Sequence, residues 1–198
     1  VLVDIGSSTT GICVYEENKL IHAAVLPVGS GNVTNDLAIV LKTSIVAAEA
    51  IKLSFGTALA KEVSGKETID LRKIDSNAKN TTTKKRVAEI VETRLAEIFE
   101  FVNNELKSIG KAGQLPGGVM LVGGGSKIAG IVDLAKQELK LPAQIGIPET
   151  SPLEIASGEL NLQVEDPEFA CSVGLMIWGS DRYSGGGGSF KGWFGRLI

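Results

Sequence analysis

Val1-Leu2-Val3-Asp4-Ile5-Gly6-Ser7-Ser8-Thr9-Thr10 is the stretch that decides the fold of this chain. Its apolar start is typical of a buried strand, which ends in a carboxylate and a turn of small residues. Gly6 permits a close approach of the backbone, and residues 7–10 leave several N–H groups pointing into one concavity, as in proteins that cradle phosphate. The pattern predicts a phosphate-binding turn, although a tight strand turn with hydroxyl caps would have a similar local sequence.

A second glycine-rich turn follows a second apolar strand, in the run Val119-Met120-Leu121-Val122-Gly123-Gly124-Gly125-Ser126. Two such strand ends favour one ligand held between them. A Walker-type loop is excluded because its Gly-x-x-x-x-Gly-Lys-Ser/Thr pattern does not occur. A Rossmann turn is disfavoured because Ile128 stands where its third glycine would be.

The site residues follow from these two turns. A carboxylate one residue before a phosphate turn can orient a hydrated magnesium ion, so we expect Asp4 to do this. The expected phosphate contacts are Gly6, Ser7, Ser8 and Thr9. Glu49 and Lys52 lie three residues apart on a predicted helix, so they share a face and could reach the ribose and adenine of a nucleotide. A solvent-exposed ion pair between them is the alternative.

Composition is that of an ordinary soluble α/β protein of 198 residues. The formal net charge of −3 and the lack of a basic stripe argue against a nucleic-acid partner. Cys13 and Cys171 lie in apolar segments without metal-ligand spacing, so buried reduced thiols and a cytoplasmic setting are expected. No run is long and apolar enough to span a membrane. The only histidine, His22, is expected to be structural, and no catalytic residue is predicted.

Patterns along the chain predict a β-hairpin over residues 11–16 and 19–28, with a turn at Glu17-Asn18. Its inward candidates are Ile12, Val14, Leu20, Ala23 and Val25. Helices are predicted over 35–41, capped by Thr34, and over 45–53, capped by Ser44 and ended by Gly56. A strand is predicted over 67–71 and a loop over 73–83. Apolar residues spaced by four and three predict a long helix containing Val87, Val91, Leu95, Ile98, Val102, Leu106 and Ile109. A strand over 144–147 and a helix over 167–178 complete the prediction.

Several of these segments resemble one known group. They are Asp4-Ile5-Gly6-x-x-Thr9 before a hairpin, Gly29-x-Gly31-Asn32-x-Thr34-x-Asp36, Glu49-Ala50-Ile51-Lys52, and Gly123-Gly124-Gly125-Ser126. Their order is similar to the second half of an actin-type ATPase, and most resembles the FtsA family of bacterial cell-division proteins. The resemblance implies an α/β, actin-like (ribonuclease H-like) fold that binds ATP and Mg²⁺. In that family the first motif is the second phosphate loop, and Glu49 and Lys52 would approach ribose and adenine. Gly123, Gly124, Gly125 and Ser126 would close on the adenosine.

The resemblance also implies a division of the chain. Residues 1–42 and 114–165 would form subdomain 2A, residues 43–113 the inserted subdomain 2B, and residues 166–182 a returning C-terminal helix. Because the chain starts inside a hydrophobic strand, we expect a preceding segment, which would hold the family's first half. Without that half, tight ATP binding, turnover and polymer contacts are not expected of this chain alone, and any ATPase activity would be slow.

A glycine linker over residues 183–189 precedes a terminal segment, 190–198, with an amphipathic helical pattern. Its apolar positions are Phe190, Trp193, Phe194, Leu197 and Ile198, with Lys191 and Arg196 on the polar side. Aromatic rings and cations suit an anionic membrane surface. An apolar end that docks on its own domain, or an engineered linker, are the alternatives. We expect this segment to fold on contact with lipid.

The resemblance therefore implies a cell-division adaptor that tethers FtsZ filaments to the cytoplasmic face of the membrane at the division site. ATP would act as a conformational and assembly ligand, and the full-length protein would form filaments. The FtsZ contact would lie within residues 43–113. One rival is an actin-like pilus-assembly ATPase of the PilM type. Another is an enzyme of the sugar-kinase and Hsp70 superfamily, which phosphoryl transfer by the complete protein would favour.

Overall fold

The structure is a computed structural model that describes residues 1–75, 78, 81–150 and 164–184. The chain divides into two units, residues 1–145 and 146–198. Each unit is described by itself. The predicted membrane segment, 190–198, and most of the predicted linker lie outside the described residues.

The first unit is built on a five-stranded sheet in the order β3-β2-β1-β6-β7. Its strands are β1 (Leu2–Ile5), β2 (Thr10–Glu16), β3 (Lys19–Leu26), β6 (Val119–Val122) and β7 (Ala143–Ile145). The first three are antiparallel, whereas β6 runs parallel to both β1 and β7. The predicted hairpin is confirmed, and its two-residue turn has positive φ at Glu17 (49°) and Asn18 (61°).

The inward face of β3 differs from the prediction. Ala24 pairs with the buried Ile12, so His22, Ala24 and Leu26 share the covered face of the sheet. Leu20 and Val25 are instead 53% and 71% exposed. Ala23 is also exposed. The pairing of β2 with β3 shifts register between Val14 and Tyr15. This shift disturbs the alternation of inward and outward side chains on which the prediction relied.

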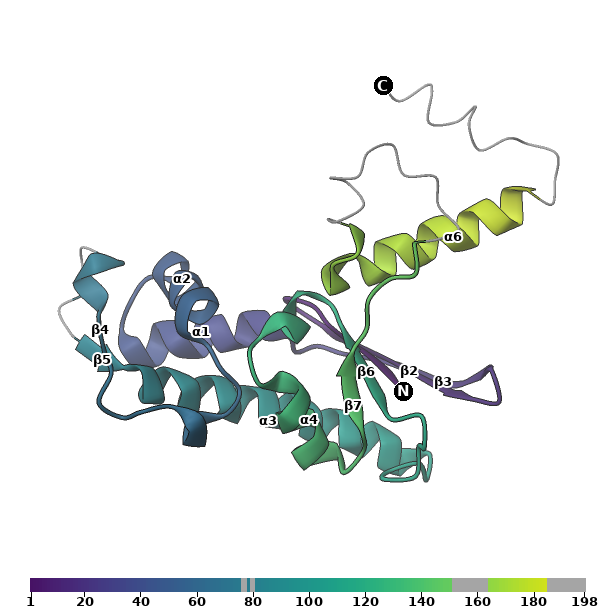
Figure 1. Ribbon diagram of the computed structural model, residues 1–198, viewed down its shortest axis with the longest axis horizontal. Coiled ribbons are helices and arrows are strands. Elements are labelled where there is room, and N and C mark those ends of the chain that lie inside the picture. The colour runs from purple at the N-terminus through teal and green to yellow at the C-terminus, as the bar shows by residue number, and fades with distance from the viewer. Residues whose placement is uncertain (76–77, 79–80, 151–163, 185–198) are drawn as a thin grey trace, which may run out of the picture. The chain divides into compact units, whose positions relative to one another are not determined.

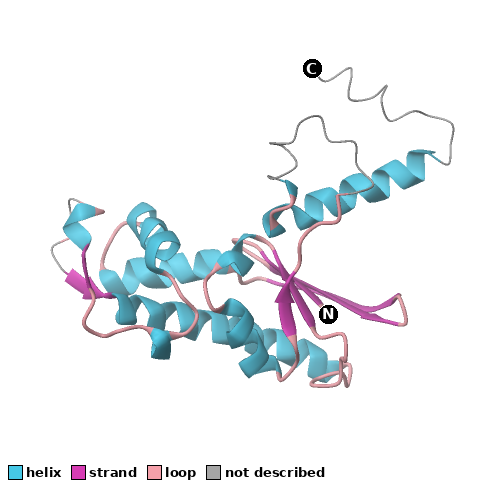
Figure 2. Cartoon of the chain, viewed as in Figure 1, coloured by secondary structure: helices cyan, strands magenta, loops and turns pink. Residues whose placement is uncertain are grey.

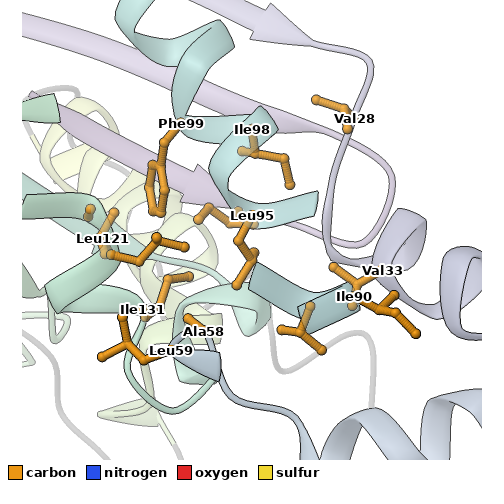
Figure 3. Close-up of a cluster of buried hydrophobic side chains, with 14 of the residues drawn as sticks. Val28, Val33, Ala58, Leu59, Ile90, Leu95, Ile98, Phe99, Leu121 and Ile131 are labelled. Carbon is orange, nitrogen blue, oxygen red and sulfur yellow. The ribbon is translucent and has the colours of Figure 1, made fainter. Parts of the chain in front are cut away.

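Helices of the first unit are α1 (Ser30–Leu41), α2 (Ile45–Phe55), α3 (Lys84–Ser108) and α4 (Ile131–Leu139). Figure 1 shows α3 running below α1 and α2 towards the sheet. The buried side chains of β1, β2 and β6 form one hydrophobic cluster with those of α1, α3 and α4, part of which is drawn in Figure 3. The stripe predicted for α3 is confirmed, since its members from Val87 to Leu106 are buried and Ile109 is half-buried.

Two helix starts illustrate what the local sequence determines. Ser44 caps α2 as predicted, because its hydroxyl accepts a hydrogen bond from the Ala47 N–H at 3.3 Å, and Gly56 ends the helix. The start predicted for α1 is wrong. This helix begins at Ser30, after Gly29, whose N–H donates to the Asn32 side chain at 3.0 Å. Thr34 therefore lies inside the helix and is not its cap.

Short elements connect α2 to α3. They are η1 (Ala60–Glu62), β4 (Thr68–Asp70), η2 (Leu71–Lys73) and β5 (Thr81–Thr83), with β4 and β5 paired as a separate sheet. Figure 2 shows this small sheet beside the N-terminal end of α3, away from the five-stranded sheet. β4 lies within the predicted strand, and β5 ends the predicted loop.

In the second unit, η4 (Pro167–Phe169) leads into α6 (Ala170–Ser184). These two elements confirm the helix predicted over 167–178 and continue it to Ser184, so the helix overlaps the first residues of the predicted linker. Cys171 is exposed and Cys13 half-buried, so the expectation of two buried thiols is wrong; neither cysteine forms a disulfide. Within the described part of the chain, no helix has the length and apolar character needed to cross a membrane.

Candidate functional site

The two glycine-rich turns lie side by side at one edge of the five-stranded sheet. Strands β1 and β6 are parallel neighbours, and Asp4 pairs with Val122 at their ends. Carboxyl ends of parallel strands meet at the same edge, so the turn after β1 and the turn after β6 leave the sheet together. The second turn forms the short helix η3 (Gly124–Lys127).

Glycine is required in the second turn because the backbone of β1 is too close for a side chain. A Cβ atom on Gly123 would lie 2.3 Å from Asp4 Oδ1 and 2.7 Å from the Ile5 carbonyl oxygen. One on Gly125 would lie 2.4 Å from Ile5 Cγ2. Gly123 also has a φ of +83°, which side chains disfavour. The triple glycine thus packs against the residue predicted to hold magnesium.

The first turn is held from behind by the start of α1. The Gly6 and Ser7 carbonyl oxygens accept hydrogen bonds from the N–H groups of Ser30 (2.8 Å) and Gly31 (2.7 Å). The Gly6 N–H bonds to the Thr9 carbonyl at 2.9 Å, which closes the turn. Ser7, Ser8 and Thr9 remain exposed. The turn is therefore fixed on one side and open on the other, as a phosphate site requires.

A cleft of about 680 Å³ joins this turn to the helix pair α1–α2. That volume lies within the range of about 300 to 1,000 Å³ typical of small-ligand sites. Ser7 and Ser8 line one part of it, and Glu49 lines another. The full lining is Ser7, Ser8, Pro27, Gly31, Asn32, Thr34, Asn35, Ile45, Val46 and Glu49. The structure thus brings Ser7 and Ser8, two of the four predicted phosphate contacts, into one cleft with Glu49, whereas Gly6 and Thr9 are not among its lining residues.

Glu49 and Lys52 do form an ion pair, at 2.8 Å between Glu49 Oε2 and Lys52 Nζ, but only Glu49 is exposed to solvent. Lys52 is only 7% exposed, and its ammonium also bonds to Thr34 Oγ1 at 3.0 Å and the Ser30 carbonyl at 3.4 Å. Thr34 in turn donates to Glu49 Oε2. Lys52 thus belongs to a buried network between α1 and α2, while Glu49 reaches the cleft.

Electrostatics keep the Glu49 carboxylate ionised. Its partial burial alone would raise the pKa. The hydrogen bonds from Lys52 and Thr34, with the charge of Lys52, outweigh that burial and hold the pKa of Glu49 below its usual value. The cleft therefore presents a negative acceptor to hydroxyl groups of a ligand.

The remaining predicted contacts lie in the turn after β6, which packs against the end of β1. Gly124 is exposed, whereas Ser126 is 2% exposed and its hydroxyl donates to the Gly123 carbonyl at 2.7 Å. The cleft beside the first turn is not lined by any of the four residues Gly123, Gly124, Gly125 and Ser126. The Ser126 hydroxyl thus stabilises the glycine turn.

Asp4 fits a magnesium ion only in company with phosphate. Val3 and Ile5 are fully buried on the covered face of the sheet, so the alternation of a strand places Asp4 on the opposite face. The described residues contain no group of three or more His, Cys, Asp or Glu side chains able to hold a metal. Magnesium commonly uses one carboxylate, water and substrate phosphate, which matches a single aspartate beside a phosphate turn.

His22 has a partner that sequence reasoning did not find. Its Nε2 lies 2.9 Å from Oε2 of Glu105, and the pair joins β3 to α3. The contact fits the structural role predicted for His22. No local pattern shows it, because the two residues are far apart in the sequence.

A second cleft of about 340 Å³ lies between α1 and α3. Its lining combines exposed apolar side chains, such as Ile39, with charged ones, among them Arg86 and Glu89. Arg94, which also lines it, makes two bonds to Asp36, Nε to Oδ2 at 2.6 Å and Nη2 to Oδ1 at 3.0 Å. The Asp36 hydrogen bonds raise the pKa of Arg94. The helix α1 therefore lines both clefts.

Comparisons with known proteins agree with this geometry. The family model described as "Cell division protein FtsA" matches residues 1–174. A cell division protein FtsA of Pseudomonas aeruginosa is 35% identical over 185 residues, which cover 93% of this chain and 43% of that protein. One of Bacillus subtilis is 35% identical over 175 residues, or 88% of this chain and 37% of that protein. The chain thus spans less than half the length of these relatives.

Solved structures of low sequence identity share the fold. MreB5 of Spiroplasma citri bound to AMPPNP aligns with a TM-score of 0.68 at 14% identity, over 93% of this chain and 53% of that chain. The PilM–PilN type IV pilus biogenesis complex aligns with a TM-score of 0.62 at 20% identity, over 90% of this chain and 45% of that chain. The predicted actin-like fold is confirmed, and at these identities the pilus protein shares the fold alone.

Proposed function

This chain belongs to the FtsA family of cell-division proteins, and we propose that it is the ATP-binding second half of an adaptor that tethers FtsZ filaments to the cytoplasmic membrane. The observation that carries the proposal is the meeting of the two glycine-rich turns at the end of β1, with Asp4 between them and a cleft leading to Glu49. The subdomain boundaries given above remain part of this proposal.

In the nucleotide site, the exposed turn of Ser7, Ser8 and Thr9 would bind the phosphate chain. Asp4 would orient the hydrated magnesium ion that neutralises the phosphate charge. Glu49 would accept hydrogen bonds from ribose, with Lys52 beside it, and Gly123, Gly124, Gly125 and Ser126 would lie against the adenosine. These groups bind and orient, so ATP acts as a conformational and assembly ligand.

Binding of the phosphate chain can be tested with a charge in the turn. Ser8→Asp places a carboxylate where the phosphate oxygens would lie, and a unit charge at contact distance costs about 1 to 4 kcal/mol in a partly hydrated site. Calorimetry on the full chain with Mg-ATP should show affinity reduced about fivefold or more, while adenosine binding is unchanged. Ser54→Asp, on an exposed position of α2 outside the cleft, is the control. Equal ATP affinity in both variants would contradict the proposal.

FtsZ would bind at the cleft between α1 and α3. Exposed Ile39 lies beside Arg86 and Arg94 in this cleft. The two arginines are paired with Glu89 and Asp36, so the cleft suits a short segment that combines apolar side chains with side chains of either charge. This extends the predicted contact region of 43–113 to α1. Arg86→Glu should reduce cosedimentation with FtsZ filaments, whereas Lys107→Glu, on the same helix but outside the cleft, should not. Equal cosedimentation of the two variants would place the contact elsewhere.

Membrane attachment would come from residues 190–198. The sequence pattern supports this, since its apolar residues recur at helical spacing and would share one side of a helix, with Lys191 and Arg196 on the polar side. The apolar residues are Phe190, Trp193, Phe194, Leu197 and Ile198. Trp193→Ser combined with Phe194→Ser should abolish cosedimentation with vesicles of phosphatidylglycerol and phosphatidylcholine. Trp178→Ser, which removes a tryptophan from α6, is the control. Retention of the double variant at the level of that control would contradict the proposal.

A further inference from the structure

We propose that Thr34 is a positioning residue that orients the Glu49 carboxylate for the two hydroxyl groups of a ribose. The inference rests on the proposed nucleotide site and adds a residue that sets its selectivity. The sequence placed Thr34 in a segment shared with the family and gave it no role beyond that of a helix cap. In the structure it is 4% exposed, inside α1, with its hydroxyl between the two charged groups of α2.

The direction of each hydrogen bond in this network is determined by chemistry. An ammonium can only donate, so Thr34 Oγ1 accepts the bond from Lys52 Nζ at 3.0 Å. A carboxylate can only accept, so the single hydroxyl proton of Thr34 goes to Glu49 Oε2. Lys52 has three N–H groups and three acceptors, on Ser30, Thr34 and Glu49. The network is thus complete without a ligand.

The consequence concerns which oxygen of Glu49 meets a ligand. Both Thr34 and Lys52 bond to Oε2, so the carboxylate is held by one oxygen and rotation about its last bond is restricted. Glu49 lines the cleft with a side chain that is 42% exposed. The other oxygen, Oε1, is then the acceptor offered to the cleft. An ionised acceptor held in one orientation favours a hydroxyl donor over a group without one.

The same helix turn also holds the phosphate site. Ser30, whose carbonyl accepts from Lys52, donates both its N–H (2.8 Å) and its hydroxyl (3.1 Å) to the Gly6 carbonyl. The phosphate turn and Glu49 are therefore fixed to one rigid element at a set separation. A ligand with phosphate at one end and ribose hydroxyls at the other can contact both the phosphate turn and Glu49, whereas inorganic triphosphate can contact only the phosphate turn.

The test compares three ligands with the full chain by calorimetry: Mg-ATP, Mg-2′-deoxyATP and inorganic tripolyphosphate. Thr34→Val keeps the side-chain shape and removes the hydroxyl, whereas Thr34→Ser keeps it. We expect Thr34→Val to lose about tenfold in ATP affinity, because Glu49 Oε2 loses the hydrogen bond that orients the carboxylate towards the ribose. Its tripolyphosphate affinity should not change, and Thr34→Ser should resemble the unaltered chain. An equal loss for ATP and tripolyphosphate would assign Thr34 a merely structural role.

The unaltered chain supplies a second measurement that does not depend on how the variants fold. It should bind ATP several-fold more tightly than 2′-deoxyATP, and equal affinities would overturn the role given to Thr34 while leaving the nucleotide site intact. A chain that binds none of the three ligands at millimolar concentration would instead overturn the proposed function itself.

Discussion

Replacing Gly123 with alanine tests the close packing of the two turns. An alanine at a φ of +83° incurs strain of about 1 to 2 kcal/mol. Its Cβ would also lie 2.3 Å from Asp4 Oδ1 and 2.7 Å from the Ile5 carbonyl, so β1 and β6 must separate locally. Overpacking of this kind costs about 1 to 3 kcal/mol. The free energy of unfolding should therefore fall by about 2 to 5 kcal/mol.

Gly113→Ala is a matched control. Gly113 has a φ of +66°, and a Cβ there would meet nothing within 4 Å, so only the backbone strain remains. Urea unfolding followed by circular dichroism at 222 nm measures both variants. We expect Gly123→Ala to be less stable than the control by about 1 to 3 kcal/mol. A difference below about 0.5 kcal/mol, the usual limit of additivity, would refute the packing of the glycine turn on Asp4.

Three further perturbations probe the elements around the site. A double-mutant cycle of Asp36→Ala and Arg94→Ala should give a coupling energy of about 1 kcal/mol. This energy should decrease in 1 M salt, where charges are screened within about 3 Å. A coupling energy of zero would contradict the ion pair between α1 and α3. The pKa of Glu49 is lowered, so its ionised form stabilises the fold at pH values above the ordinary pKa of 4.5. That stabilisation is lost as the pH falls through the lowered pKa. Glu49→Gln should therefore remove this part of the pH dependence of the unfolding free energy. Ser44→Ala should destabilise the chain by about 1 kcal/mol through loss of the cap of α2, whereas the exposed Ser54→Ala should have almost no effect.

Much of the fold could be predicted because its signals are local. The stripe on α3 depends on helical periodicity, and the cap at Ser44 on the hydroxyl of one residue. The strand turns depend on glycine and on the apolar runs before them. Errors arose where a neighbouring element decided the outcome. Thr34 has the chemistry of a cap, but Gly29 and Asn32 start the helix earlier, because the start of α1 bonds to the turn after β1.

Individual residues of the candidate site could be predicted from the sequence, but the contacts between them could not. The sequence pointed to Glu49 and Lys52 from their spacing, and the same spacing allowed an exposed ion pair. What buries Lys52 is the packing of α2 on α1, which places Ser30 and Thr34 around its ammonium. Thr34 and Lys52 are 18 positions apart in the sequence, and Ser30 and Lys52 are 22 apart, on two different helices. No periodic pattern in the sequence therefore predicts these contacts.

The most direct test of the site follows backbone amide signals by nuclear magnetic resonance as Mg-ATP is added to the full chain. If one nucleotide contacts both turns, the amides of Ser7, Ser8 and Thr9 should shift together with those of Gly123, Gly124 and Gly125. Both groups should saturate at the same nucleotide concentration. Shifts in only one turn, or two different saturation points, would contradict a shared site.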